Sequence, residues 1–288
     1  MIPWEKSLPV VQSYGLTDRG RVRASNQDQF LIAELARTMW VHAASMPLPE
    51  TQYGDHHGHV LLVADGMGGH LGGDVASALT VQCLERFLLH ALHRFSNLRD
   101  FEMESVALEF QDALHTARDL IVEASAEDPA LAGMGTTVTM ALASGWKALV
   151  FHAGDSRCYL LRGDRLEQLT EDHTVVAELI RRGALRPENA VRHAYRHVVT
   201  NAVGGNSPQL HVDVRQVDLE EDDTLLLCSD GLTDMLSDER LAAILQAEAA
   251  PRAACERLLA EANAAGGRDN ITAIVARVRA RESRPVAG

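Results

Sequence analysis

The sequence has few cysteines, and their spacing excludes two kinds of site. The four of them, Cys83, Cys158, Cys228 and Cys255, lie far apart and form no Cys-x-x-Cys pair. Thiolate zinc sites and disulfide scaffolds need closer spacing in short segments, so neither is expected. Cys83 and Cys228 stand within apolar patterns and are predicted to be small core residues.

Long apolar runs are also missing. No stretch approaches the 18 apolar residues of a membrane span, and the opening "MIPWEKSLPVV" lacks the apolar region of a secretion signal. We therefore expect a cytoplasmic protein without a membrane partner.

Basic residues are outnumbered, 27 against 40 acidic ones, which gives a formal net charge of −13. Binding to DNA or RNA relies on Lys and Arg that neutralise phosphates, so no nucleic-acid partner is expected. Local acidic clusters instead suit divalent cations.

What is present is enough apolar material for a substantial core, with 46% hydrophobic residues over 288 positions. Strand-like runs come in succession and helical patterns come in pairs between them, which favours an α+β fold over a doubly wound parallel sheet. The expected strands are 10–16, 29–33, 60–64, 136–143, 148–153, 158–161, 212–217, 224–228 and 271–278, and the expected helices are 74–88, 101–121, 239–249 and 251–264.

Acidic residues stand at the ends of several expected strands. Asp65, Asp155 and Asp230 follow apolar runs, whereas Asp28 and Asp269 precede strands. A single Asp-Gly pair is usually only a turn. Several carboxylates that converge at strand ends, however, repel one another unless cations neutralise them, and hard divalent metals prefer oxygen ligands. The pattern thus predicts a metal site.

Six motifs extend this interpretation, in the order "GRVRASNQD", "VADGMGGHLGGDVAS", "GMGTTVT", "HAGDSRCYLLR", "CSDGLTD" and "GGRDNIT". Together they resemble the metal-dependent protein phosphatases, the type 2C or PPM family, in its compact bacterial form. The resemblance implies a four-layer α/β/β/α sandwich of two antiparallel sheets flanked by helical pairs. It also implies one catalytic domain at 11–278, with an extension at 1–10, an insertion at 34–58, a flap at 171–209 and a tail at 279–288.

The same resemblance implies a centre of two Mn²⁺ or Mg²⁺ ions. Asp65 would bridge both ions, the Gly66 carbonyl would bind one, and Asp230 and Asp269 would bind the other. Asp28 would orient a water molecule. A metal-bridging hydroxide would then attack the phosphorus of a phosphoserine or phosphothreonine protein directly, in opposition to a Ser/Thr kinase.

Two further roles follow from the resemblance. Arg23 would hold the phosphate, since a guanidinium matches two of its oxygens at once. A third cation would use Asp155 and Asp230, with Asp234 as a further candidate ligand. The alternatives are an ion pair of Asp155 with Arg157 and a turn-capping role for Asp234.

The sequence departs from the family pattern at two positions. Met67 stands where the eukaryotic branch often has a general-acid histidine, which His70 does not replace, and Gln27 stands where many members have glutamate. Metal-bound water is therefore the expected proton donor, and metal affinity is expected to be lower.

Other polar residues have two interpretations each. The histidines at 42, 56, 57 and 59 fit no standard zinc spacing and are predicted to be solvated. Basic side chains of the flap either contact the substrate or form a solvated face; they are His173, Arg181, Arg182, Arg192, His193 and Arg196.

Three functions compete at this stage. The leading one is a monomeric Ser/Thr phosphoprotein phosphatase. A catalytically silent binding module of the same fold and a phosphatase of small molecules are the alternatives, and turnover of phosphopeptides against phosphorylated metabolites separates them.

Overall fold

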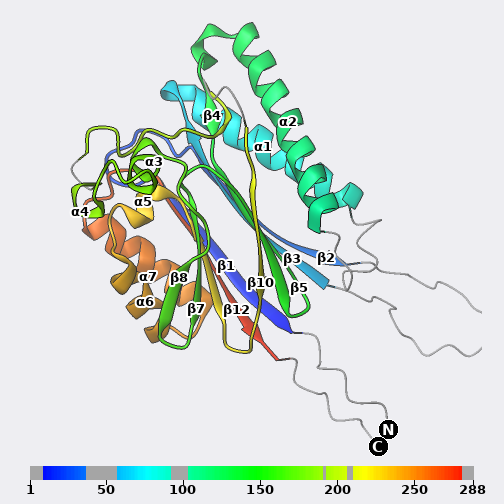
Figure 1. Ribbon diagram of the computed structural model, residues 1–288, viewed down its shortest axis with the longest axis vertical. Coiled ribbons are helices and arrows are strands. Elements are labelled where there is room, and N and C mark those ends of the chain that lie inside the picture. Colours follow the sequence, from blue (N-terminus) through cyan, green and yellow to red (C-terminus); the bar gives the residue numbers. More distant parts are fainter. Residues whose placement is uncertain (1–8, 37–56, 92–102, 191–192, 206–209, 281–288) are drawn as a thin grey trace, which may run out of the picture.

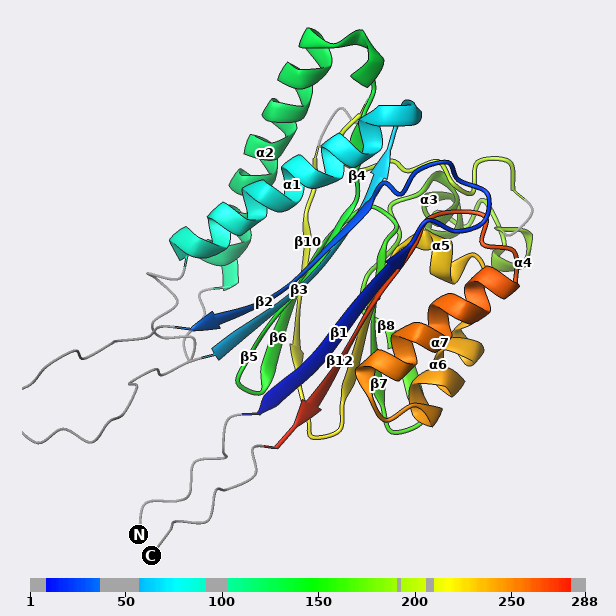
Figure 2. The same ribbon diagram turned by 180° about the vertical axis from the view of Figure 1, so that it is seen from behind.

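Four layers of secondary structure stack against one another, two sheets in the middle and a pair of helices outside each (Figures 1 and 2). This computed structural model describes residues 9–36, 57–91, 103–190, 193–205 and 210–280.

One sheet has five strands, and every neighbouring pair is antiparallel. Across the sheet the strands are β1 (Val10–Asp18), β12 (Ile271–Arg279), β11 (Thr224–Cys228), β7 (Arg157–Arg162) and β8 (Arg165–Gln168).

The second sheet is also antiparallel and contains β2 (Asp28–Ala36), β3 (His57–Met67), β5 (Val138–Ser144), β6 (Lys147–Ala153) and β10 (Asp213–Asp218). Two short strands extend it at one end, β4 (Gly135–Thr136) and β9 (Val203–Gly204).

Each sheet carries its own helical pair. Helices α1 (Gly69–Ala91) and α2 (Met103–Glu127) cover the second sheet, where Phe110 of α2 stacks on Phe151 at 4.4 Å between ring centroids. Helices α6 (Asp238–Ala247) and α7 (Pro251–Ala264) cover the first sheet. The predicted four-layer α/β/β/α sandwich is confirmed.

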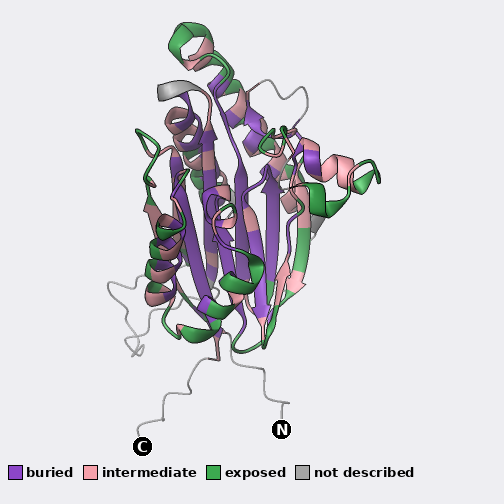
Figure 3. Ribbon diagram, turned by 90° about the vertical axis from the view of Figure 1, so that its left-hand side faces the viewer, coloured by how far each residue is buried: buried purple, intermediate pink, exposed green. Residues whose placement is uncertain are grey.

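The continuous apolar runs of the central strands follow from burial on both faces. Because side chains alternate along a strand, Leu62 of β3 packs toward the helical layer while Leu61 packs toward the other sheet. The strands are accordingly buried along most of their length (Figure 3).

Three local features differ from the sequence patterns. The predicted strand 136–143 is interrupted at Thr137, although β4 and β5 pair with β3 in one continuous register. Helix α1 starts at Gly69, before the predicted start at residue 74, and includes most of the glycine cluster after Asp65. The sequence patterns also missed β8 and the short helix α5 (Asp230–Thr233).

The segments expected to form the insertion and the flap contain some regular structure. In 34–58, β2 extends to Ala36 and β3 begins at His57, and 37–56 lies outside the described residues. The flap contains α3 (Val175–Arg181), α4 (Pro187–Ala190) and β9, and its two short helices lie beside α5 at one end of the sandwich (Figures 1 and 2). None of the helices in the described part of the chain is both long enough and apolar enough to cross a membrane.

Candidate metal centre

Asp65 is held by its own backbone at a fixed point of the second sheet. Its N–H donates to Thr137 Oγ1 at 3.0 Å, and its carbonyl accepts from the Thr137 N–H at 2.9 Å. The sequence pattern placed Asp65 after the strand, but β3 continues to Met67, so Asp65 lies within it. The bond from the Thr137 N–H continues the register in which β4 and β5 pair with β3, whereas the Thr137 hydroxyl takes the place of a backbone acceptor for the Asp65 N–H.

Gly66 and Gly73 allow α1 to lie directly against β3. A Cβ added at Gly66 would come within 2.1 Å of the Gly73 carbonyl oxygen, a contact between backbones that no side-chain movement relieves. Glycine at 66 is therefore required for this close approach, and the predicted binding of a cation by the Gly66 carbonyl stays a prediction.

Asp28 lies opposite Asp65 in the register of β2 and β3 and joins the two sheets. Its Oδ2 accepts hydrogen bonds from Ser229 Oγ at 2.7 Å and Thr272 Oγ1 at 2.6 Å, both belonging to the first sheet's side of the site. Its Oδ1 is buried without a hydrogen-bond partner. Burial raises the pKa of Asp28 to about 6.

Asp155 and Asp230 approach Asp65 from two other elements. Asp155 lies in the turn between β6 and β7, and Asp230 begins α5 directly after β11. Burial raises the pKa of Asp155 to about 7 and that of Asp230 well above its usual range.

The pKa of Asp65 is also raised well above its usual value, first by burial and then by the charges of Asp28, Asp230, Asp155 and Asp269. These carboxylates come from both sheets and from positions up to 241 residues apart in the sequence. Four of them line one cleft and Asp28 lies opposite Asp65 in the strand register, so the fold brings them together, as the sequence predicted.

Arg23 contacts this acidic group through Asp269, which precedes β12. The Arg23 Nη2 donates to Asp269 Oδ2 at 2.5 Å, and this hydrogen bond raises the pKa of Arg23. The guanidinium is still about half exposed, so one side of it remains open to solvent.

Asn270 fixes the loop that carries Arg23. Its Nδ2 donates to the carbonyls of Arg19 and Ser25, at 2.9 and 2.8 Å, and its Oδ1 accepts from the Gln27 N–H at 2.8 Å. The sequence analysis assigned no role to Asn270, or to Ser229 and Thr272, whose hydroxyls donate to Asp28. All three lie in the motifs "CSDGLTD" and "GGRDNIT".

One cleft of about 760 Å³ collects the predicted residues. Every one of them except Asp28 lines it, namely Arg23, Asp65, Gly66, Asp155, Asp230, Asp234 and Asp269. Asp28 lies beneath, 3% exposed.

The donor set fits divalent cations. Among the described residues, the buried carboxylate oxygens without a hydrogen-bond partner are Asp28 Oδ1 and Asp230 Oδ1. Buried carboxylates that repel one another are stabilised by cations that prefer oxygen ligands. Asp65, Asp230 and Asp269 are the residues placed to hold such ions.

The alternative roles of Asp155 and Asp234 can now be judged. Arg157 does not pair with Asp155, because its Nε and Nη2 donate to Asp172 at 2.9 and 2.6 Å and its Nη1 donates to the Tyr159 hydroxyl at 2.9 Å. Asp234 occupies the C-cap position of α5, and its side chain lies 3.5 Å from His197 Nδ1.

The basic residues of the flap divide into two groups. Arg181 pairs with Glu171 and Arg182 pairs with Glu178, which makes them part of the surface. His173 is buried and bonds to Asp213. By contrast, Arg196 and His197 line the cleft, and sequence reasoning missed His197.

The remaining histidines and the two departures from the family pattern lie at the following positions. His42 and His56 lie outside the described residues, His59 lies in β3, and His70 falls within α1. Gln27 and Met67 line the cleft, as the motif predicts.

Comparisons with known proteins agree with this geometry. The family model described as protein phosphatase 2C matches residues 51–269. The serine/threonine phosphatase stp of Listeria innocua is 34% identical over 259 residues, covering 90% of this chain and 92% of that one. The serine/threonine protein phosphatase PstP of Mycobacterium tuberculosis is 36% identical over 263 residues, which are 91% of this chain and 44% of that longer protein.

Solved structures show the same fold. The M. tuberculosis phosphatase PstP/Ppp superposes with a TM-score of 0.74 at 30% identity, over 93% of this chain and 99% of that one. The catalytic domain of PstP in complex with two manganese ions superposes with a TM-score of 0.71 at 31% identity, over 94% and 99%. The chain therefore belongs to the protein phosphatase 2C family of metal-dependent phosphatases, which use Mn²⁺ or Mg²⁺.

Proposed function

We propose that this chain hydrolyses phosphoserine and phosphothreonine in proteins at a centre of two Mn²⁺ or Mg²⁺ ions. The observation that carries the proposal is the convergence of buried carboxylates from both sheets on one open cleft. Asp65 bridges the ions, the Gly66 carbonyl binds one of them, and Asp230 and Asp269 bind the other.

The ions, when bound, supply an acidified bridging water that attacks phosphorus directly, and they stabilise the charge on the phosphoryl oxygens. Asp28 contributes by position. Its Oδ2 is held by two hydroxyl groups and its Oδ1 has no hydrogen-bond partner in the described structure, so Oδ1 is the atom that would orient a water molecule of the centre. No cysteine or serine nucleophile is needed.

Arg23 is placed to bind the phosphate. It bonds to Asp269 in this structure, and Asp269 is also a proposed metal ligand. Once the charge of Asp269 is shared with a cation, the guanidinium turns its donors to the phosphate oxygens, which it matches two at a time. The shared carboxylate therefore links metal binding to substrate binding.

The domain boundaries, the third cation, the location and the opposing kinase belong to the same proposal. Residues 11–278 form the catalytic domain, with the insertion at 34–58 and the flap at 171–209, between an extension at 1–10 and a tail at 279–288. Asp155, Asp230 and Asp234 hold a third cation. The enzyme works as a cytoplasmic monomer that opposes a Ser/Thr kinase.

The substrate class is tested by comparing phosphate release from different phosphate esters with the same metal ion present. With Mn²⁺ present, phosphate release is measured from a phosphothreonine peptide and from phosphorylated sugars and nucleotides at equal concentration. The cleft is open and lined by polar side chains, so the peptide is expected to give the higher kcat/KM. A preference for one metabolite would replace the proposal with small-molecule hydrolysis. A folded, metal-loaded chain without any turnover would indicate a binding module.

A further inference from the structure

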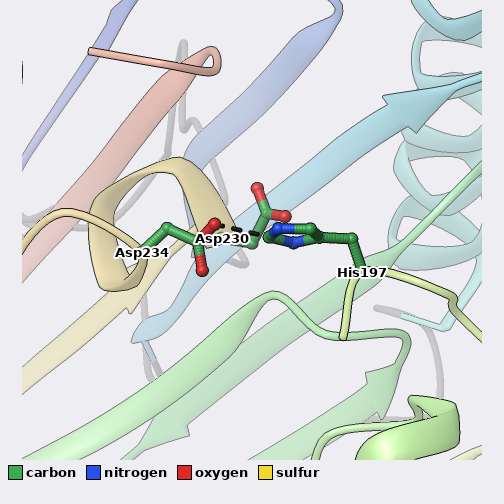
Figure 4. Close-up of side chains that lie close together, drawn as sticks. All are labelled: His197, Asp230 and Asp234. Carbon is green, nitrogen blue, oxygen red and sulfur yellow. Dashed lines mark ion pairs between the residues drawn. The ribbon is translucent and has the colours of Figure 1, made fainter. Parts of the chain in front are cut away.

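His197 is a nitrogen donor that the flap brings to the acidic cleft. It lies between α4 and β9, and its ring points toward Asp230 and Asp234 of the α5 segment (Figure 4). One ligand atom from each of these three side chains lies within 4.8 Å of the others. The resemblance to the family assigned only carboxylates to this region.

The distances fit ligands of one ion better than a hydrogen bond. His197 Nδ1 and Asp234 Oδ2 are 3.5 Å apart, longer than the about 2.7–2.9 Å of a charge-assisted hydrogen bond. Two ligands that each lie about 2.1 Å from an octahedral ion are separated by about 3 Å when adjacent and about 4.2 Å when opposite. The observed separation falls between these values.

A second, independent observation points to an ion at the same place. Asp230 is deeply buried at its Oδ1, which has no hydrogen-bond partner in the described structure. A carboxylate oxygen without a donor is costly unless a cation satisfies it. Asp230 thus brings a carboxylate with one unsatisfied oxygen to the cluster that it forms with Asp234 and His197.

We propose that His197 is an imidazole ligand of the third cation, together with Asp230 and Asp234. This inference rests on the proposed metal centre and gives the third site a mixed nitrogen and oxygen ligand set. Imidazole suits first-row transition metals, whereas Mg²⁺ favours oxygen and water. The third site of this chain therefore selects Mn²⁺ over Mg²⁺, in contrast to a site made of carboxylates alone.

Arg196 opposes this role of His197 in the present arrangement. Its Nε donates to His197 Nε2 at 2.6 Å, so Nε2 carries the lone pair and Nδ1 carries the proton. Binding of a metal by Nδ1 requires the other tautomer, with the proton on Nε2, and that proton then meets the Arg196 donor. Metal binding must displace Arg196 from His197. A glutamine at 196, whose amide oxygen accepts from Nε2–H, should strengthen the site.

The test is a titration of the full-length, metal-depleted protein with Mn²⁺, followed by electron paramagnetic resonance. The signal of free Mn²⁺ at each step of the titration gives its concentration and hence the dissociation constants. Pulsed measurements on the loaded protein then detect any nitrogen that is coupled to the bound ion. The variants are His197→Ala, Arg196→Gln and, as a matched control from the same segment, His193→Ala, whose ring lies against Tyr195. His197 is 48% exposed, so its removal should leave the fold intact, which circular dichroism checks.

The wild type should show nitrogen coupling that His197→Ala removes and His193→Ala keeps. The weakest Mn²⁺ site should lose about tenfold or more in affinity in His197→Ala and gain affinity in Arg196→Gln. Competition with Mg²⁺ should displace Mn²⁺ from that site more readily in His197→Ala than in the wild type.

Unchanged affinity of the weakest site in His197→Ala, or loaded protein without nitrogen coupling, would overturn the inference. The outcome is separate from that of the proposed function. Phosphatase turnover without nitrogen coupling would refute only the ligand role of His197, whereas coupling without turnover would support that role and refute the proposed function.

Discussion

The stability of the metal-free protein should fall as the pH rises from 5 to 8, and divalent cations should reverse this loss. Burial raises the pKa of Asp28 to about 6 and that of Asp155 to about 7. At pH 5 both carboxyls are protonated in the folded chain but already ionised in the unfolded chain, whose pKa values are near 4. The folded chain binds more protons, so stability is lost as the pH rises through 6 and 7.

The size of this loss can be calculated. The free energy of unfolding falls by about 1.4 kcal/mol for each pH unit over which a group is protonated only in the folded state. Between pH 5 and pH 8, Asp28 and Asp155 together cost about 4 kcal/mol. Asp65 and Asp230, whose pKa values are raised further, add to this loss in the same direction.

His152 makes the stability rise with pH, which is opposite to the effect of the carboxyls. The comparison of protein with and without metal cancels its contribution. Burial lowers its pKa to about 4, so below about pH 6.5 the unfolded chain takes up a proton that the folded chain does not. Its ring bonds to Thr139 and to the Glu171 carbonyl, outside the metal centre, so it contributes equally with and without metal.

The assay is therefore urea unfolding by circular dichroism at pH 5, 6, 7 and 8, in EDTA and at one fixed concentration of free Mn²⁺. The free energy of unfolding in Mn²⁺ minus that in EDTA should grow by at least about 4 kcal/mol from pH 5 to pH 8. In Asp28→Asn this growth should be smaller by about 1 kcal/mol, the share of that carboxyl. A difference that is flat with pH would refute the convergence of buried carboxylates.

Three substitutions test single features of the site. Gly66→Ala should lower the free energy of unfolding by about 1–3 kcal/mol, because its Cβ meets the Gly73 carbonyl; an unchanged melting temperature would contradict that contact. Arg23→Ala should raise KM for a phosphopeptide about tenfold or more, the worth of a charged hydrogen bond, with a smaller effect on kcat; an unchanged KM would exclude the clamp role. Asn270→Ala should also raise KM while Arg23 is intact, because the loop that carries the arginine loses three hydrogen bonds. Wild-type KM in that variant would show that the loop is held in another way.

Much of the fold and of the centre could be predicted because the information is local. Apolar runs marked the central strands, and the amphipathic pattern at 251–264 matches α7 from its first residue to its last. Asp65 and Asp230 were found because each follows a strongly apolar strand run, a signal that a single sequence carries.

The features that were missed depend on contacts between distant segments. The strand is interrupted at Thr137, where the hydroxyl accepts the hydrogen bond from the Asp65 N–H, and no pattern within 136–143 reveals this bond. His197 is one of several histidines in a basic stretch, and only the placement of the flap against α5 distinguishes it from His193. Arg157 likewise bonds to Asp172, which is 15 residues away in the sequence, and not to Asp155, which is two residues away.

The central claim is that the converged carboxylates hold the cations that hydrolyse a phosphoprotein. It is tested most directly by phosphate release from a phosphothreonine peptide, with Mn²⁺, with Mg²⁺ and with EDTA, for the wild type and for Asp230→Asn. The account predicts turnover that requires a divalent cation and that is abolished in the variant, while circular dichroism shows an intact fold. Turnover that persists in EDTA, or an Asp230→Asn protein as active as the wild type, would contradict it.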